Sequence, residues 1–205
     1  MKLIKLAAAA VIAVSSFAAN AGLLYIEGGV DQPVTNNNYF KAQLNPQAYN
    51  IGGNLRASQD APLNLEFTFL GDEAGWLNTF TFIPSGNTIT NVSEGSFSVS
   101  SYYSAGDAIE FSFSTSGLDA LLNTVLNGLN THGDNVVSFG IALDTVFKGV
   151  KYDAILFFDD TGGPNDDDNH DDLLIGIKAS VPESSTFVLM LMGLAGLFAA
   201  RRLKA

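Results

Sequence analysis

The sequence predicts an all-β fold, a β-sandwich of jelly-roll-like type with about eight strands and one amphipathic helix, and three observations support it. Several short runs alternate apolar and polar residues, and Gly, Asn, Ser and Asp separate these runs. The chain has 205 residues and no cysteine, so a large core rather than disulfides must stabilise it. Its 15 phenylalanines can fill the space between two sheets.

Residues 1–21, before the predicted domain, have the features of a signal peptide. Lys2 and Lys5 precede an apolar run, and Ala19 and Ala21 supply the small residues that a signal peptidase requires at its cleavage site. We therefore expect export through the inner membrane, with signal peptidase as the first partner. The mature domain is then expected to occupy residues 22–180.

Strands are expected in seven segments of that domain. Four segments alternate apolar and polar residues, which places one face on the core and one in water: 63–69, 76–82, 97–99 and 109–113. Three segments are more continuously apolar, as strands in the middle of a sheet are: 136–143, 152–158 and 173–177. Residues 28–59, rich in Asn, Gln and Gly with weak periodicity, are expected to form a long loop or an irregular edge.

One helix is expected between the strands. Leucine and valine recur at helical spacing from Leu118 to Leu129, with Ser116 or Thr115 as the cap. A helix that binds a partner is the alternative, but a leucine stripe of this kind usually packs on the core. We expect the helix to lie across an open end or edge of the sandwich.

The segment 159–172 holds seven aspartates in 14 residues, between two predicted strands. Calcium takes about six to eight oxygen ligands, and carboxylates on a tight loop can converge on one ion. The loop is not an EF-hand, because it lacks the glycine and the closing glutamate of that motif. The expected calcium ligands are Asp166, Asp168, Asp171 and Asp172, with Asp159 and Asp160 approaching from the strand end.

A solvated acidic turn is the alternative interpretation, since charged turns keep a protein soluble and its edge strands unpaired. The density of carboxylates favours calcium or a similar hard cation, because neighbouring carboxylates repel one another without one. His170 and His132 are not expected to bind a metal, because a lone imidazole among carboxylates more often gains a proton than coordinates zinc.

The charge of the mature domain excludes some partners. Residues 22–180 carry 20 acidic and five basic side chains, a formal charge of −15. Nucleic acid is not an expected partner, because phosphate binding requires clustered Lys and Arg. The length of this segment suits a single domain.

Residues 181–205 combine a polar motif, an apolar stretch and a basic end. The motif contains Val181, Pro182, Glu183 and Ser184, and the basic residues are Arg201, Arg202 and Lys204. Between them, residues 187–200 carry no charge, and as a helix they would reach about 21 Å, short of the roughly 30 Å hydrocarbon core. A core helix is the alternative, but the apolar residues surround this helix instead of forming a stripe. A short transmembrane helix that contacts the membrane transiently is therefore expected.

This order of Pro-Glu motif, hydrophobic helix and Arg-rich end resembles the PEP-CTERM sorting signal of Gram-negative bacteria, with Ser184 where a second proline is usual. The resemblance implies that an exosortase removes the tail and delivers the protein to the cell surface or extracellular matrix. A GPI-anchor signal is the nearest alternative, but such signals usually end in apolar residues.

Two further motifs are similar to those of an uncharacterised β-rich domain of exported bacterial proteins. The first runs from Phe67 to Asn78, and the second combines Phe-Asp-Asp with Asp-Asp-Leu in residues 158–173. The resemblance implies a calcium-loaded surface domain in which Asp72 and Glu73 meet the acidic loop. The alternative for Glu73 is an exposed carboxylate in a turn.

The expected function is that of a non-catalytic surface or matrix protein, associated with a biofilm or exopolysaccharide. The first alternative is a calcium-dependent carbohydrate-binding module in which the ion, or Trp76, Tyr102 and Tyr103, contact sugar. A glycan-active enzyme is a weaker alternative. Paired aspartates can act as acid and base, but neighbouring aspartates offer no way to keep one neutral, and no nucleophile, zinc or phosphate motif is present.

Overall fold

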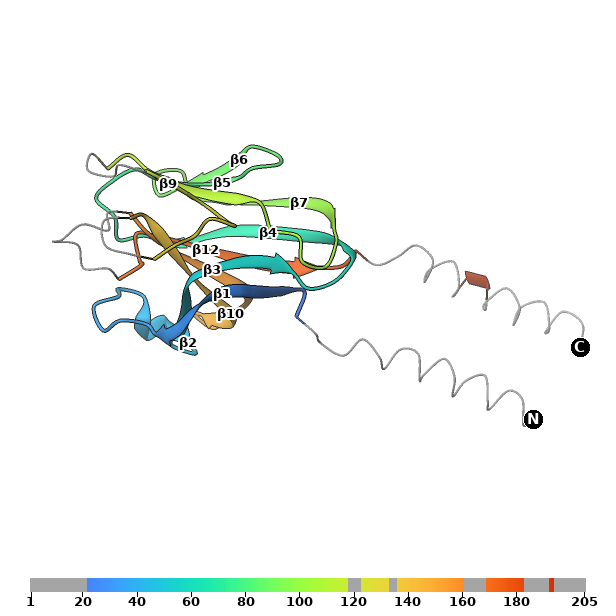
Figure 1. Ribbon diagram of the computed structural model, residues 1–205, viewed down its shortest axis with the longest axis horizontal. Coiled ribbons are helices and arrows are strands. Elements are labelled where there is room, and N and C mark those ends of the chain that lie inside the picture. Colours follow the sequence, from blue (N-terminus) through green and yellow to red (C-terminus); the bar gives the residue numbers. More distant parts are fainter. Residues whose placement is uncertain (1–21, 118–122, 133–135, 161–168, 183–191, 194–205) are drawn as a thin grey trace, which may run out of the picture.

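The computed structural model of this chain describes residues 22–117, 123–132, 136–160, 169–182 and 192–193. The described residues form an all-β fold of two antiparallel sheets, which confirms the predicted class and is consistent with a β-sandwich (Figure 1). The expected signal peptide and nearly all of the expected C-terminal helix lie outside these residues. Within the part of the chain that is described, no helix has the length and apolarity needed to cross a bilayer.

The larger sheet has eight strands and the smaller has four. Across the larger sheet the order is β1 (Leu24–Pro33), β3 (Ala48–Ala57), β10 (Ser138–Phe147), β11 (Val150–Asp159), β12 (Leu173–Ser180), β4 (Ala61–Gly71) and β7 (Ser96–Tyr103), with β2 (Leu44–Asn45) paired to β10. Across the smaller sheet it is β6 (Asn87–Thr90), β5 (Asn78–Phe82), β8 (Phe111–Thr115) and β9 (Thr124–Leu126). A 3-10 turn, η1 (Lys41–Gln43), precedes β2.

All seven predicted strand segments overlap strands of the structure, and the continuously apolar ones lie in the middle of the larger sheet as expected. In β11, Leu156 and Phe158 pack between the two sheets, whereas Ile155 and Phe157 pack on the opposite face. The prediction of about eight strands was too low, since twelve are present in the described residues. The additional strands are short or lack clear alternation.

The prediction of a long loop was wrong for residues 28–33 and 48–57, which belong to the paired strands β1 and β3, whereas the alternative of an irregular edge agrees with β1 at the edge of the larger sheet. β1 is an edge strand with mostly exposed side chains, so it shows little apolar alternation. Gly28, Gly29 and Gly52 have φ angles of 76°, 68° and 75°, which interrupt the pleat of the two strands. The sequences of β1 and β3 therefore show no clear alternation of apolar and polar residues.

The predicted amphipathic helix was wrong over residues 124–129, whereas residues 118–122 lie outside the described part. Val125 is buried opposite Phe113 in the β8–β9 pair, and Leu129 is 71% exposed. Residues 124–126 therefore form a strand paired with β8, because helical propensity is a weak preference that tertiary contacts can override. The leucines that suggested a helical stripe do not share one buried face here.

Phenylalanines fill the main core, between the two sheets. Phe113 and Phe158, from opposite sheets, stack with ring centroids 4.8 Å apart and planes inclined by 7°. Phe67 and Phe80 also meet across the sheets, with centroids 5.1 Å apart. A second, smaller core lies on the other face of the larger sheet, where Tyr49 packs against Phe157 with ring centroids 5.5 Å apart.

Two buried asparagines connect the sheets through backbone hydrogen bonds. Asn127, just after β9, donates to the carbonyls of Leu55 and Ile109 at 2.7 and 2.8 Å and accepts from the Leu55 N–H at 2.8 Å. Asn130 donates to the carbonyls of Gly53 and Phe139, both at 2.8 Å. The segment after β9 is thus bonded to strands of the larger sheet.

The chain enters and leaves the domain at the same end. Leu24 pairs with Ala57, and Ser180 pairs with Asn64, only a short turn along the chain from Ala57. We call this the terminal end. At the opposite end, which we call the acidic end, β11 finishes and β12 begins (Figure 1).

The Phe113 side chain should be among the most important for stability. Replacing it with alanine, Phe113→Ala, should lower the free energy of unfolding by about 3–5 kcal/mol, because it removes a fully buried ring from the contact with Phe158. Denaturant unfolding of the full chain measures this. The matched control is Val92→Ala, at a side chain that is 78% exposed, and it should change stability by no more than about 0.5 kcal/mol.

Candidate functional site

Acidic residues from two neighbouring strands meet at the acidic end. Asp159 and Asp160 lie where β11 finishes, and Asp171 and Asp172 immediately precede β12. The N–H of Asp172 donates to the carbonyl of Phe158 at 3.1 Å, and the N–H of Asp160 donates to Asp172 Oδ2 at 2.8 Å. Antiparallel pairing thus brings together Asp160 and Asp172, which are 12 positions apart in the sequence.

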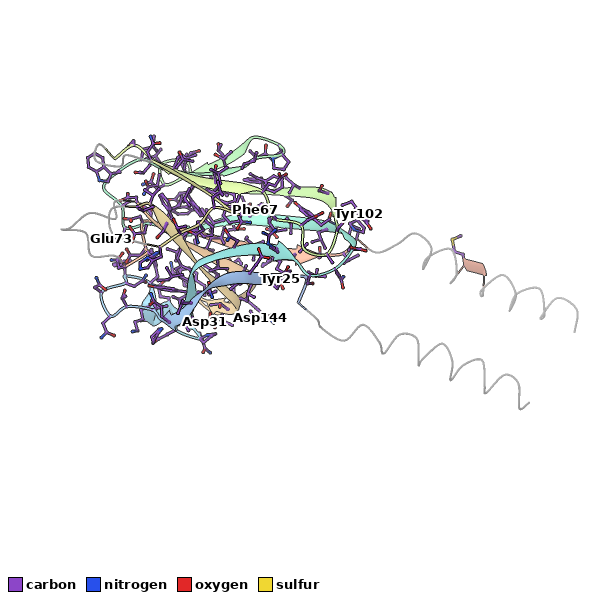
Figure 2. The ribbon with its side chains drawn as sticks, in the orientation of Figure 1. Tyr25, Asp31, Phe67, Glu73, Tyr102 and Asp144 are labelled. Carbon is purple, nitrogen blue, oxygen red and sulfur yellow. The ribbon has the colours of Figure 1, made fainter. Side chains whose placement is uncertain are left out.

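Glu73 joins these aspartates from the segment just after β4, the other neighbour of β12. Its N–H donates to the carbonyl of Asp171 at 3.1 Å. One carboxylate oxygen each from Glu73, Asp171 and Asp172 lie within 4.8 Å of one another. Figure 2 shows Glu73 at this end of the molecule, far from Tyr102 at the terminal end. We call Glu73, Asp159, Asp160, Asp171 and Asp172 the acidic centre.

Asp72 is not part of the group of three carboxylates, although it precedes Glu73 in sequence. Burial raises the pKa of its carboxyl, a hydrogen bond to Asn91 opposes this effect, and the nearby Glu94 carboxylate adds to the increase. These neighbours belong to the turn after β6 and the segment before β7. The two adjacent carboxylates therefore have different surroundings.

Residues distant in sequence hold the acidic centre in place, and Asn78 is one of them. Its Nδ2 donates to Asp160 Oδ2 at 2.8 Å and to the Asp172 carbonyl at 3.4 Å. Asn78 is fully buried, and its Oδ1 has no hydrogen-bond partner among the residues that the structure describes. Asn78 closes the first of the two resemblance motifs, but no local signal marked it as a site residue.

The loop before η1 supplies further support, from the segment for which the sequence predicted only irregular structure. Asn38 Nδ2 donates to the Asn169 carbonyl at 2.7 Å, and the Tyr39 N–H donates to Asp171 Oδ2 at 2.5 Å. Asn38 lies 131 residues from Asn169 in the chain, so no sequence pattern connects them. The loop fixes both the backbone and the side chain of the segment that leads into β12.

His170 connects a hydroxyl and a carboxylate in the interior. Its Nε2 lies 2.9 Å from Ser138 Oγ, and its Nδ1 lies 3.5 Å from Asp159 Oδ2. The order of hydroxyl, imidazole and carboxylate matches that of acyl-transfer triads. Ser138 is only 1% exposed, however, so a substrate cannot reach its hydroxyl in this arrangement. The three side chains form a buried polar chain that ends at Asp159 of the acidic centre.

The acidic centre concentrates negative charge in the interior. Asp159, Asp160 and Asp171 are each no more than 3% exposed. A buried carboxylate needs compensating charge or protonation, because removing it from water is costly. His170 is one ionisable neighbour, since its Nδ1 lies 3.5 Å from Asp159 Oδ2. The five Lys and Arg side chains of residues 22–180 make the following contacts: Lys41 with the Val34 carbonyl and Asn36, Arg56 with Glu27, Lys148 with Phe147, Lys151 with Asp144 and Lys178 with Tyr152.

The donor set suits a hard cation. Calcium binds carboxylate, amide and carbonyl oxygens at about 2.3–2.6 Å, so two ligands of one ion lie at most about 5 Å apart. The 4.8 Å limit for Glu73, Asp171 and Asp172 agrees with that spacing. Asp166 and Asp168, the other expected ligands, lie outside the described residues.

The aromatic residues expected to contact sugar do not lie together. Trp76 is at the acidic end, two residues before Asn78, and it is 40% exposed. Tyr102 and Tyr103 lie at the terminal end, where Tyr103 pairs with Ala61 at the start of β4. In the sorting motif, Val181 and Pro182 follow β12, and the rest of the motif and the basic residues lie outside the described part.

Comparison of the chain with protein-family models, with curated proteins and with solved structures found no match. A fold alone does not define a function. The function is therefore argued from the acidic centre and its surroundings.

The support that Asn78 gives to Asp160 can be measured. Asn78→Ala should lower the free energy of unfolding by about 1–3 kcal/mol, because it removes a donor from a buried carboxylate. Asn87→Ala, at an exposed position on the same sheet, should cost no more than about 0.5 kcal/mol. Chemical denaturation of the two variants tests this, and equal stabilities would contradict the role of Asn78.

Proposed function

We propose that this chain is a non-catalytic, exported surface or matrix protein whose acidic centre binds calcium. The observation that carries the proposal is the geometry and charge of the acidic centre: one carboxylate oxygen each from Glu73, Asp171 and Asp172 lie within 4.8 Å of one another, beside the buried Asp159 and Asp160. A divalent cation would compensate this charge, and the oxygen-only donor set is the one that calcium prefers.

The first ligands are Glu73, Asp171 and Asp172, which the geometry brings together. The remaining acidic residues that the sequence offers would complete the site or surround it: Asp159, Asp160, Asp166 and Asp168. An ion held by these groups links the end of β4 to the start of β12. Its role is to stabilise the acidic end of the domain, rather than to activate a substrate.

The surface location rests on the two ends of the chain. Residues 1–21 support export, followed by cleavage by signal peptidase. Residues 181–205 support removal of the tail by an exosortase after transient membrane contact. The described domain begins and ends at the terminal end, and the acidic centre lies at its opposite end. The protein would then present its calcium site to the exopolysaccharide or matrix outside the cell.

Calcium-dependent carbohydrate binding is the second candidate, and the position of Trp76 favours it. This ring is 40% exposed, and its carbonyl accepts a hydrogen bond from Asn91 Nδ2 at 2.8 Å. Asn91 Oδ1 accepts from the Asn78 N–H at 3.1 Å, and Asn78 in turn contacts Asp160. A sugar stacked on Trp76 would therefore lie near the ion, and chelation would release it.

Calcium should raise the thermal unfolding midpoint of the full chain, because a ligand that binds only the native state stabilises it by about 2.7 kcal/mol at 100 times its Kd. Magnesium should have a smaller effect, since it requires a more rigid octahedral site. Glu73→Gln should reduce the calcium effect without unfolding the protein, because Glu73 is exposed. Asp171→Ala should reduce it further. Differential scanning calorimetry in calcium, magnesium and EDTA measures these shifts.

The matched control is Asp144→Asn, which changes an exposed carboxylate that pairs with Lys151 outside the acidic centre. The φ angle of Asp144 is 51°, a conformation that asparagine tolerates well. This variant should retain the full calcium shift. Equal midpoints in calcium and EDTA for the unmodified chain would reject the calcium site.

A further inference from the structure

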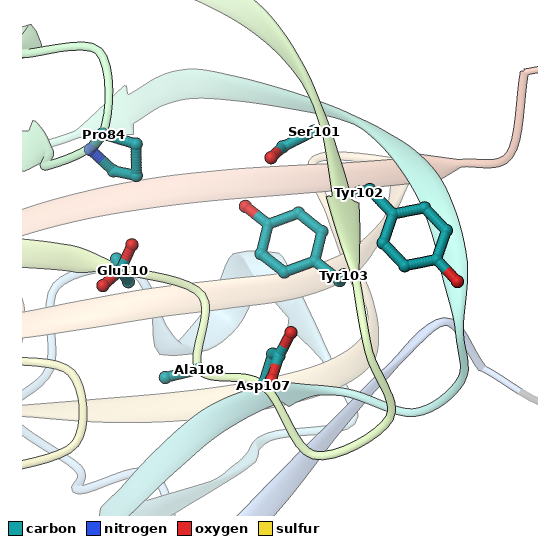
Figure 3. A pocket seen from close by; sticks show the side chains of 7 residues that line it. All are labelled: Pro84, Ser101, Tyr102, Tyr103, Asp107, Ala108 and Glu110. Carbon is teal, nitrogen blue, oxygen red and sulfur yellow. The ribbon is translucent and has the colours of Figure 1, made fainter.

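A cleft of about 330 Å³ opens at the terminal end, remote from the acidic centre. It lies between the end of β7, in the larger sheet, and the segments that flank β5 and β8, in the smaller sheet (Figure 3). Its lining residues are Pro84, Ser101, Tyr102, Tyr103, Asp107, Ala108 and Glu110. The volume is near the lower limit of the roughly 300–1,000 Å³ that small-molecule sites occupy.

The cleft forms where the two sheets separate. Side chains alternate along β7, so Ser101 and Tyr103 share the face that carries Val99 into the main core, whereas Tyr102 lies on the other face. Val99 packs against that core, but Ser101 on the same face is exposed. Figure 3 shows the Tyr103 ring directed into the cleft and the Tyr102 ring directed away from it.

Backbone hydrogen bonds hold the opposite wall. The carbonyl of Asp107 accepts from the Ala57 N–H at 2.9 Å, and the carbonyl of Glu110 accepts from the Ile83 N–H at 3.0 Å. Asp107 Oδ2 also accepts from the Ser104 N–H at 2.7 Å. The wall is therefore tied to both sheets, and a ligand would not have to order it on binding.

The polar groups of the cleft are acceptors and hydroxyls. Burial, followed by the Glu110 and Asp107 carboxylates, raises the pKa of Tyr103 to about 12. Its phenol therefore remains a hydrogen-bond donor at neutral pH, next to two carboxylates that accept. No Lys or Arg is among the lining residues. This combination disfavours an anion and suits a ligand that carries several hydroxyl groups.

We propose that this cleft binds one or two residues of a neutral saccharide, independently of calcium. The Asp107 and Glu110 carboxylates would accept from sugar hydroxyls, the Tyr103 and Ser101 hydroxyls would complete the hydrogen bonds, and Pro84 would contact an apolar sugar face. Protein–sugar recognition of this kind needs no metal, so the inference goes beyond the proposed calcium site and does not depend on it.

The test is binding of the full chain, in EDTA, to an array of neutral, uronic-acid-containing and amino-sugar-containing oligosaccharides. At least one neutral oligosaccharide should bind, and Tyr103→Phe and Glu110→Gln should each weaken that binding at least tenfold. Asp144→Asn is the matched control for Glu110→Gln, because Asp144 is an exposed carboxylate outside both the cleft and the acidic centre, and it should leave the affinity unchanged. Thermal unfolding midpoints establish that the variants are folded, and Glu110 is exposed, so Glu110→Gln carries the test if Tyr103→Phe is unstable.

Three results would overturn the inference: no saccharide binds, only uronic-acid-containing saccharides bind, or neither variant weakens binding. Binding that requires calcium and is unaffected by Glu110→Gln would place the sugar at the acidic end instead, as the second candidate function requires. A chain that binds neutral sugar in EDTA but shows no calcium-dependent stabilisation would retain this inference and reject the calcium site. The two proposals therefore fail separately.

Discussion

The pairing of β11 with a neighbour on each side is the constraint on which the rest of this structure depends. Both faces of β11 are apolar, and each is buried in a different core, so the strand belongs in the middle of a sheet. Its antiparallel pairing with β12 then fixes where the acidic segment begins and ends. Asp159 and Asp171 are buried because the strands that carry them are central, and β4 brings Glu73 to the same place because it pairs with β12. The packing of apolar side chains thus determines where the carboxylates meet.

The sequence predicted most of the larger sheet and the acidic half of the candidate site. Strands with one buried face can be predicted because apolar and polar residues alternate along them. The acidic segment can be recognised because it holds seven aspartates between Asp159 and Asp172. The remaining parts depend on interactions that leave no local pattern. β1 and β3 are interrupted by glycines at positive φ, and β9 forms because β8 has an edge to pair with. Asn78 reaches Asp160 from 82 residues away, and Asn38 reaches the Asn169 carbonyl from 131 residues away, a proximity that only the folded topology creates.

The domain has two ends with different chemistry. At the acidic end, amides and an imidazole contact buried carboxylates, and the carboxylate oxygens are ligands that suit a cation. At the terminal end, two exposed carboxylates and a buried phenol line an open cleft. These groups can accept hydrogen bonds from the hydroxyl groups of a ligand and donate one to it. β4 connects the two ends, since Gly71 lies near the acidic centre and Ala61 lies beside Tyr103. Two kinds of contact could therefore occur on one domain without competing for the same surface.

The two buried asparagines after β9 also have a mechanical consequence. Asn127 and Asn130 bond backbone groups of the larger sheet that strand pairing leaves available, much as an additional strand would. Sliding one sheet over the other by a single pleat would leave these groups and the amides buried without partners, at a cost of several hydrogen bonds. The sheets are therefore interlocked rather than only stacked through phenylalanine rings, which resists shear between them. A force applied between the two ends of the domain would therefore act on both sheets together.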